Sequence, residues 1–424
     1  MNSNSIIIEN ARLRKTLILD RNFIVSSEIF NKKSEAHLVS GQGSEEFILR
    51  FKSGFFSKEI KASDLKVELC ENASSDGGDT YTIVFKCCKL WDSKVSVKLI
   101  YNVINDNPVI RKHIELSFDK RGNKAIMLDY IDFESLHFDG TLNHWSIPKQ
   151  ANSHVPGYAL EMGQPLYVGS LFFGVEFPAS LNKIEKGITS LKYYSGKKLT
   201  DIMKNNLYVS YNAVIGGADG DTFPQVQRAF FDYIKTISKP IKLRRQYNSW
   251  YDHMLNITRE NIYGSFLEIE KAMTKSGEKP LDCYVADDGW NDYSKGFWGF
   301  NEKFPDELYP FSALTGALSS NFGLWLGPRG GYTNDTIKFA KHIEKAGNGY
   351  INKNSKDICV ASDKYIAKTS ALMLDFQKRF DLNYWKLDGF AQRPCKNKHH
   401  DHMVGGDSYM YFYTDVWEKW TAVF

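Results

Sequence analysis

The chain has 424 residues, enough for two or three domains and a sizeable buried core. Its 54 basic and 50 acidic residues leave a net charge of +4, too small a bias to indicate a nucleic acid or an anionic membrane surface as a partner. We therefore expect an uncharged substrate, and the many Tyr, Phe and Trp residues suit either sugar stacking or a β-rich core.

The six cysteines are sparse and irregularly spaced, so no disulfide framework or zinc pattern is visible. The first residues lack a basic segment followed by a long apolar run, and no apolar segment reaches the ~18 residues of a membrane-spanning helix. These features predict a cytoplasmic protein without membrane contact.

Residues 1–224 contain short alternating or apolar runs that are broken by Gly, Asn, Asp and Ser. No helical period of comparable length intrudes, which predicts a large antiparallel β-sandwich. Residues 71–79 are expected to form a turn-rich loop between two strands. The clearest predicted strands lie at residues 5–9, 47–51, 81–85, 95–103, 109–116 and 125–133.

An irregular stretch separates the later strands of this region and contains Trp145, His154, Tyr158 and Glu161. These side chains can belong to a loop that reaches toward a neighbouring site, but packing is the commoner role of such residues. We favour the packing interpretation.

The pattern changes at residues 225–237, where apolar residues recur at helical spacing. We interpret residues 225–240 as a linker helix that ends at Pro240.

Residues 241–424 repeat the order strand, loop, helix four times, which is typical of half of an eight-fold barrel. Four such units leave a sheet with an exposed edge, so we expect the barrel to continue in a longer protein or to be completed in trans. The predicted strands lie at residues 247–250, 281–286, 322–326 and 384–387, and the predicted helices at 259–274, 311–319, 334–346, 363–380 and 408–420.

The fourth predicted strand carries Lys386 and ends at Asp388. Residues two apart on a strand share a face, so the ammonium is expected to favour the ionised form of the carboxylate. An anionic aspartate at the carboxyl end of a barrel strand can act as a nucleophile or brace a positive charge. The alternative is an ion pair with a structural role only.

Further polar and aromatic residues follow the other strands. Carboxylates and planar donors suit vicinal sugar hydroxyls, aromatic rings suit the apolar face of a pyranose, and glycoside cleavage needs an anionic carboxylate beside the anomeric carbon. The candidates are Trp250 after the first strand, Asp287, Asp288 and Trp290 after the second, and Arg329 after the third.

Four segments together resemble glycoside hydrolase family 36, the α-galactosidase and α-N-acetylgalactosaminidase family, in the clan that also contains families 27 and 31. These segments are residues 107–116, the Asp-Asp-Gly-Trp turn at 287–290, residues 303–305 leading into 322–325, and Lys-Leu-Asp at 386–388. Their order and spacing agree over roughly residues 90–420.

The resemblance implies a β-super-sandwich of the galactose-mutarotase type followed by an α/β unit, the first half of a (β/α)8 barrel. It implies retaining hydrolysis of terminal α-linked galactose or N-acetylgalactosamine by double displacement, without metal or cofactor, in a bacterial enzyme whose partners are α-galactoside oligosaccharides or glycoconjugates. Homo-oligomer formation is left open. The family's acid/base aspartate comes from a strand beyond residue 424, so this chain alone is expected to be inactive or severely impaired.

The resemblance also implies residue roles. Asp388 corresponds to the nucleophile, Lys386 to a donor to sugar hydroxyls, Asp287 and Asp288 to the pair that binds the C4 and C6 hydroxyls, and Trp250 and Trp290 to aromatic walls. The chain departs from the family at residues 327–332, where Arg329 places a cation. That cation is compatible with a different substituent at C2 or a different leaving group.

Two other functions remain open. One is a family-31-like α-glucosidase or α-xylosidase, or a raffinose-synthase-like transglycosylase. The other is a noncatalytic carbohydrate-binding protein in which Asp388 is structural. The cluster of His399, His400 and His402 near Asp401 is interpreted as a solvated loop rather than a metal site, because a short His-rich loop rarely supplies converging ligands without a distant partner.

Overall fold

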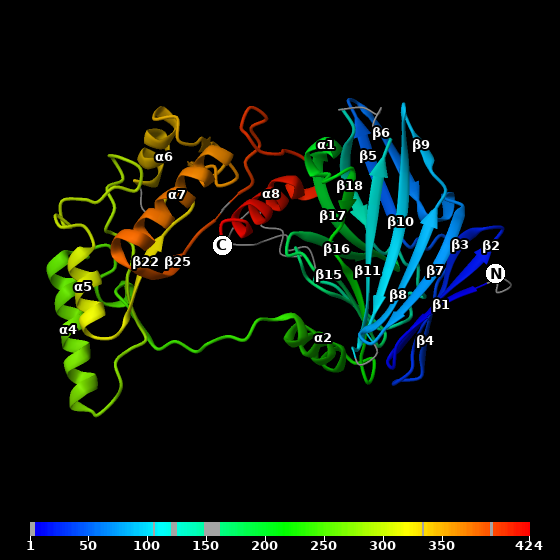
Figure 1. Ribbon diagram of the computed structural model, residues 1–424, viewed down its shortest axis with the longest axis horizontal. Coiled ribbons are helices and arrows are strands. Elements are labelled where there is room, and N and C mark those ends of the chain that lie inside the picture. The colour runs from blue at the N-terminus through cyan, green and yellow to red at the C-terminus, as the bar shows by residue number, and fades with distance from the viewer. Residues whose placement is uncertain (1–4, 105–106, 120–124, 148–161, 333–334, 391–392) are drawn as a thin grey trace. The chain divides into compact units, whose positions relative to one another are not determined.

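The computed structural model describes residues 5–104, 107–119, 125–147, 162–332, 335–390 and 393–424 (Figure 1). The chain forms two compact units. Of the described residues, unit 1 comprises those from 5 to 147, from 162 to Lys239 and Gly405–Thr414, and unit 2 comprises those within Pro240–Val404 and Asp415–Phe424. The predictions made for His154, Tyr158 and Glu161 fall outside the described residues.

Unit 1 contains three antiparallel sheets. A four-stranded meander runs β1 (Ser5–Glu9), β2 (Leu13–Asp20), β3 (Phe23–Asn31) and β4 (Ala36–Val39). A five-stranded sheet has the order β16 (Ser180–Glu185), β17 (Ile188–Lys198), β12 (Met127–Asp132), β5 (Ile48–Ser53) and β6 (Phe56–Lys61).

The third sheet of unit 1 has ten strands. Its order is β13 (His144–Trp145), β14 (Leu166–Val168), β15 (Leu171–Val175), β19 (Ala213–Gly217), β11 (Val109–Phe118), β10 (Ser93–Val103), β8 (Gly78–Phe85) and β7 (Val67–Ser75), with β18 (Leu207–Val209) on β11 and β9 (Cys88–Leu90) on β10 (Figure 1). The helical elements of unit 1 are η1 (Ala62–Asp64), α1 (Leu199–Ile202) and α2 (Phe223–Ile237).

Alternating hydrophobic patterning explains these strands. In β11 every second side chain from Ile110 to Phe118 is buried, while the residues between them are partly exposed, as expected where one face of a sheet meets a core. The antiparallel β-sandwich predicted for this region is confirmed. The predicted loop at residues 71–79 is wrong, because most of it belongs to β7 and β8, which pair as a hairpin from Val67 and Phe85 to the turn at 76–77.

Helix α2 packs its aromatic face on the ten-stranded sheet. Phe230 lies edge-on to Phe172 at 5.6 Å between ring centroids, and Tyr233 contacts the same ring. Trp145 stacks on Tyr167 at 5.2 Å in this cluster. The packing role favoured for Trp145 is therefore confirmed.

A closed set of charges lies in the core of unit 1. Lys15 on β2 and Lys112 on β11 each contact both Glu46 and Glu134, and all four side chains are at most 2% exposed. Ser26 and the hydroxyl of Tyr101 donate further hydrogen bonds to Glu46. Because two positive charges meet two negative ones, the cluster is neutral overall, which makes its burial tolerable.

The ion pairs of the cluster shift the pKa values of Glu46 and Lys15. Burial alone would raise the pKa of Glu46, but the charges of Lys112 and Lys15 outweigh it and hold that pKa below its usual range. Burial alone would lower the pKa of Lys15, whereas Glu134 and Glu46 raise it above the usual value. The folded protein thus favours the ionised forms of both Glu46 and Lys15. The stabilisation from Glu46 is lost as the pH falls below the ordinary carboxylate pKa, and that from Lys15 is lost as the pH rises above the ordinary lysine pKa.

Lys112→Met tests this cluster, because it leaves two buried carboxylates with one ammonium. We expect the free energy of unfolding to fall by about 3–5 kcal/mol near neutral pH. The loss should shrink as the pH is lowered, because the variant can protonate a glutamate while the wild type cannot do so without breaking its pairs. Lys98→Met, at an exposed lysine on β10, is the control and should change stability little. Denaturant unfolding at several pH values measures both variants, and equal losses would contradict this account.

Unit 2 contains a parallel sheet of four strands in the order β20 (Gln246–Asn248), β21 (Cys283–Ala286), β22 (Asn321–Leu326) and β25 (Leu382–Leu387). Its helices are α3 (Trp250–His253), α4 (Arg259–Lys275), α5 (Tyr309–Ala317), α6 (Thr336–Lys345), α7 (Asp363–Phe380) and α8 (Met410–Thr421), the last preceded by η2 (Asp407–Tyr409) and begun within unit 1. A short antiparallel pair, β23 (Ile351–Asn352) and β24 (Asp357–Ile358), lies between α6 and α7.

The sequence explains this alternation. All four residues of β21 are buried and β22 is buried from Phe322 to Leu326, as is usual for parallel strands with both faces covered. Helix α4 begins at a capping box in which Thr258 and Asn261 bond each other's backbone N–H groups. Each predicted strand and helix of this region has a counterpart within a few residues. In the described part of the chain, no helix is both long enough and apolar enough to span a membrane.

Candidate functional site

The register of the parallel sheet aligns the strand ends of unit 2. Ala286 pairs with Leu324, and Leu326 pairs with Leu387. The chain leaves β21 at Asp287 and β25 at Asp388, so both carboxylates lie at the same edge of the sheet. This edge is the one at which parallel α/β folds bind ligands.

Lys386 forms an ion pair with Asp287 rather than with its sequence neighbour. Its ammonium lies 2.7 Å from Oδ2 of Asp287, while Oδ1 of that aspartate accepts a hydrogen bond from the backbone N–H of Asp288. The backbone N–H of Asp287 in turn donates to Ser249 Oγ at 2.9 Å. Asp287 is 1% exposed, whereas the lysine side chain is 31% exposed, so the lysine is the accessible member of the pair.

Asp388 is held by two aromatic donors from the third strand and its loop. The hydroxyl of Tyr332 donates to Oδ1 at 2.8 Å, and the indole N–H of Trp325 lies 3.4 Å from Oδ2. These two contacts fix the position of the carboxylate. The sequence predicted Lys386 as the partner of Asp388, but the ammonium of Lys386 pairs with Asp287 instead.

Asp288 is a buried carboxyl group at this edge with a raised pKa. It is 1% exposed, accepts a hydrogen bond from the Tyr293 hydroxyl at 2.7 Å, and its Oδ2 has no hydrogen-bond partner among the described residues. Burial raises its pKa to about 6, and the nearby charges of Asp287 and Asp388 act in the same direction. A buried polar atom without a partner at a ligand-binding edge is available to a bound hydroxyl.

Arg329 lies behind Tyr332 instead of facing the solvent. Its side chain is 7% exposed and pairs with Asp357 at 3.4 Å, and its guanidinium lies over the Tyr332 ring at 4.3 Å from the centroid. The backbone N–H of Arg329 also donates to Gly389 O at 3.0 Å. The predicted cation is therefore present near Asp388, but it supports Tyr332, whose residue is 52% exposed.

The two predicted tryptophan walls have different environments. Trp290 is fully buried, contacts Trp298, Phe300 and Phe376, and donates its indole N–H to Trp325 O at 3.0 Å. It packs as a core residue, which does not fit the role of an aromatic wall that the resemblance implies for it. Trp250 begins α3 and stays partly exposed.

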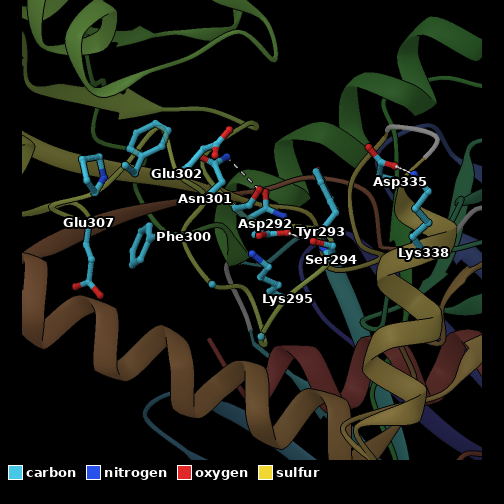
Figure 2. A pocket seen from close by; sticks show the side chains of 15 residues that line it. Asp292, Tyr293, Ser294, Lys295, Phe300, Asn301, Glu302, Glu307, Asp335 and Lys338 are labelled. Atoms are coloured by element: carbon cyan, nitrogen blue, oxygen red, sulfur yellow. Dashed lines mark hydrogen bonds and ion pairs between the residues drawn. The ribbon is translucent and has the colours of Figure 1, made fainter.

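A hollow of about 930 Å³ lies beside this edge, formed by residues 291–307 with Asp335 and Lys338 from the start of α6. Figure 2 shows the ion pair between Asp335 and Lys338 at one end of the hollow and Glu307 at the other. Tyr293 lines the hollow and donates a hydrogen bond to Asp288, so it connects the hollow with the carboxylate edge. Sequence reasoning overlooked Tyr293, whose position three residues after the Asp-Asp-Gly-Trp turn was the available signal.

The arrangement offers a partly exposed carboxylate at Asp388, a partly exposed lysine at Lys386 and a buried carboxyl group at Asp288 whose Oδ2 has no partner among the described residues. This set can bind several hydroxyl groups and place a nucleophile beside them.

Asp288→Asn tests the raised pKa. Because the folded-state pKa of about 6 exceeds the ordinary value of ~3.9, the wild type should lose on the order of 2–3 kcal/mol of stability as the pH rises from 4 to 7. The amide introduced by this substitution cannot ionise, so the variant should lack this slope. The exposed Glu302→Gln should keep it. Unfolding followed by tryptophan fluorescence measures the slopes, and a wild-type slope in the amide variant would contradict the assignment.

Gly389→Ala tests how closely the backbone after Asp388 packs against Tyr332 and Arg329. Gly389 has φ +77°, and a Cβ there would lie 2.7 Å from the Tyr332 hydroxyl and 3.0 Å from Arg329 Nε. Gly347 has a similar φ of +74° with no atom near its Cβ position, so Gly347→Ala isolates the backbone cost of about 1–2 kcal/mol. We expect a clearly larger loss of stability for Gly389→Ala, measured by thermal unfolding; equal losses would show that the close approach is absent.

No protein-family model matches the sequence, and no curated protein sequence matches it. Solved structures do match. The α-galactosidase from Lactobacillus brevis superposes with a TM-score of 0.63 at 10% identity, over 100% of this chain and 69% of that one. The galactosidase domain of the α-galactosidase–sucrose kinase AgaSK gives 0.60 at 13% identity, over 100% and 69%.

A third similar structure is the GH36 α-galactosidase AgaA from Geobacillus stearothermophilus, with a TM-score of 0.55 at 11% identity over 99% of this chain and 70% of that one. At such identities the likeness concerns the fold. The resemblance to glycoside hydrolase family 36 that the motifs indicate is thus confirmed at the level of the fold, which this chain shares with the matching part of these α-galactosidases.

Proposed function

We propose that the chain belongs to a retaining exo-α-glycosidase that removes terminal α-linked galactose or N-acetylgalactosamine from oligosaccharides or glycoconjugates. The observation that carries the proposal is the position of Asp388: a partly exposed carboxylate at the carboxyl end of β25, beside the Lys386–Asp287 pair. The fold shared with α-galactosidases supports it.

In this proposal Asp388 attacks the anomeric carbon. The carboxylate oxygen forms a bond to that carbon as the bond to the leaving oxygen breaks, and water later hydrolyses the glycosyl-enzyme ester with overall retention. Tyr332 and Trp325 hold the carboxylate in place by hydrogen bonds. Because these bonds fix the side chain before substrate binds, less ordering is needed in the reaction itself.

Lys386, Asp287 and Asp288 bind the sugar hydroxyls. The ammonium donates to one hydroxyl while Asp287 keeps it oriented, and Oδ2 of Asp288, which has no partner among the described residues, takes part in a second hydrogen bond. Trp250 supplies an aromatic wall. Arg329 acts as a positioning residue through Tyr332 and does not contact the sugar.

The four parallel strands of unit 2 form, in this proposal, one half of a (β/α)8 barrel. Their sequential order 1-2-3-4 and aligned ends agree with that geometry. The general acid is then an aspartate of a later strand, as the sequence resemblance implies, and full activity requires the complete barrel.

Asp388→Asn in the full-length gene product tests the nucleophile. We expect kcat/KM on nitrophenyl α-galactoside or α-N-acetylgalactosaminide to fall by about 10⁴-fold or more, because the amide cannot form the ester intermediate. Asp381→Asn is the control: it replaces an exposed aspartate before the same strand and should keep activity.

The substrate panel and the anomer of the first product separate the other functions. Cleavage of α-glucoside or α-xyloside but neither galactose-type substrate would overturn the sugar assignment, and transfer to a sugar acceptor in place of water would indicate a transglycosylase. If Asp388→Asn keeps wild-type turnover, the nucleophile is elsewhere. If neither protein turns over any glycoside yet both bind galactose, the chain is a carbohydrate-binding protein.

A further inference from the structure

Four side chains with metal-binding atoms converge in unit 2, apart from the carboxylate edge. They are Cys359, Cys395, His400 and His402, and one ligand atom from each lies within 4.8 Å of all the others. The proposed glycosidase chemistry uses none of them.

Two separate loops supply this Cys2His2 cluster. Cys359 follows β24 and precedes α7, whereas the other three residues lie in the loop that follows β25. The sulfur of Cys395 lies 3.3 Å from Nδ1 of His400, and ligand atoms of Cys359 and His402 lie within 4.8 Å of it. The cluster therefore joins loops that are distant in sequence.

The cluster is buried. Cys359 and Cys395 are at most 1% exposed and His402 is 9% exposed. Tetrahedral zinc, with Zn–S of about 2.3 Å and Zn–N of about 2.0–2.1 Å, places neighbouring ligand atoms about 3.3–3.8 Å apart. The distance from His400 Nδ1 to Cys395 Sγ, 3.3 Å, lies in this range. The other pairs of ligand atoms are at most 4.8 Å apart, so zinc binding would require them to move closer by about 1 Å or less.

The surroundings orient both imidazoles. Nδ1 of His402 lies 3.0 Å from the carbonyl oxygen of Met403; since a carbonyl only accepts, this nitrogen carries the proton and Nε2 presents a lone pair. The ring of His400 stacks on Tyr350 at 4.2 Å with an interplanar angle of 8°, and the side-chain amide of Asn397 donates to its Nε2 at 2.8 Å. Because Nε2 accepts, the proton of the neutral ring sits on Nδ1, and metal binding at Nδ1 requires that proton to leave and the Asn397 amide to turn.

The backbone that carries the ligands is also fixed. The N–H of Cys359 donates to Tyr350 O at 2.8 Å. The carboxylate of Asp401 accepts from the backbone N–H of Lys364 in the first turn of α7, and Lys419 donates to the carbonyl of Asp401 at 3.2 Å. The ligands thus converge from a rigid frame, which a structural metal site requires.

We propose that Cys359, Cys395, His400 and His402 form a structural zinc site. Four protein ligands complete a tetrahedron and leave no open position, and two thiolates with two imidazoles favour zinc among the common metals. The ion ties the loop that begins at Asp388 to the segment in which Asp357 holds Arg329. The interpretation of the histidine loop as solvated holds for the exposed His399 but is wrong for the buried His402.

Metal analysis of the protein purified from zinc-supplemented medium tests the site directly. We expect about one zinc ion per chain, and protein expressed with cobalt in place of zinc should show the visible absorption bands of tetrahedral, thiolate-bound Co²⁺. Removing the zinc with a chelator should lower Tm, and adding zinc should restore it, because an ion that binds only the folded state stabilises it. Wild-type protein suffices for these measurements.

Variants assign the ligands. Cys395→Ser and His402→Ala should lose the metal and the cobalt bands, whereas the matched controls Cys70→Ser and His399→Ala should retain both. Protein that contains no metal, gains none from added zinc or cobalt and keeps its Tm in chelator would overturn the proposal, as would a Cys359–Cys395 disulfide found by mass spectrometry. So would full metal retention in both ligand variants.

Discussion

The ion pair between Lys386 and Asp287 is the contact on which the candidate site depends. It joins the last residues of β25 to the first residue after β21, and the parallel register is what brings these two strand ends to one edge. Because Lys386 pairs with Asp287, it does not hold the Asp388 carboxylate. That carboxylate instead accepts hydrogen bonds from Tyr332 and Trp325. One pairing thus gives Asp287 and Asp388 different partners at the same edge.

Buried ionisable side chains have different environments in the two units. In unit 1 two lysines and two glutamates neutralise each other and two hydroxyl donors complete the cluster, so these charges serve the fold. In unit 2 Asp288 is almost as deeply buried, yet one of its oxygens has no partner among the described residues and its pKa is raised. An incompletely satisfied carboxyl group is costly for folding and is more easily explained by ligand binding.

Much of the fold was predictable from local patterns. Alternating hydrophobic runs predicted the sandwich strands, and the alternation of strands and helices predicted the parallel sheet. The loop predicted at residues 71–79 was wrong because polar, exposed residues also form hairpin strands. Side-chain partners were less accessible. No local signal tells that Lys386 turns toward Asp287, that Trp290 faces the core, or that Cys359 meets the histidine loop, since each contact is long-range.

The most direct measurement of the central claim is to trap the glycosyl-enzyme intermediate in the full-length protein with a slowly hydrolysed fluorinated α-galactosyl substrate and to locate the label by peptide mass spectrometry. The account predicts one sugar attached to the peptide that contains Lys386 and Asp388, at the Asp388 side chain. A stable label on any other carboxylate, or inactivation that leaves Asp388 unmodified, would contradict it.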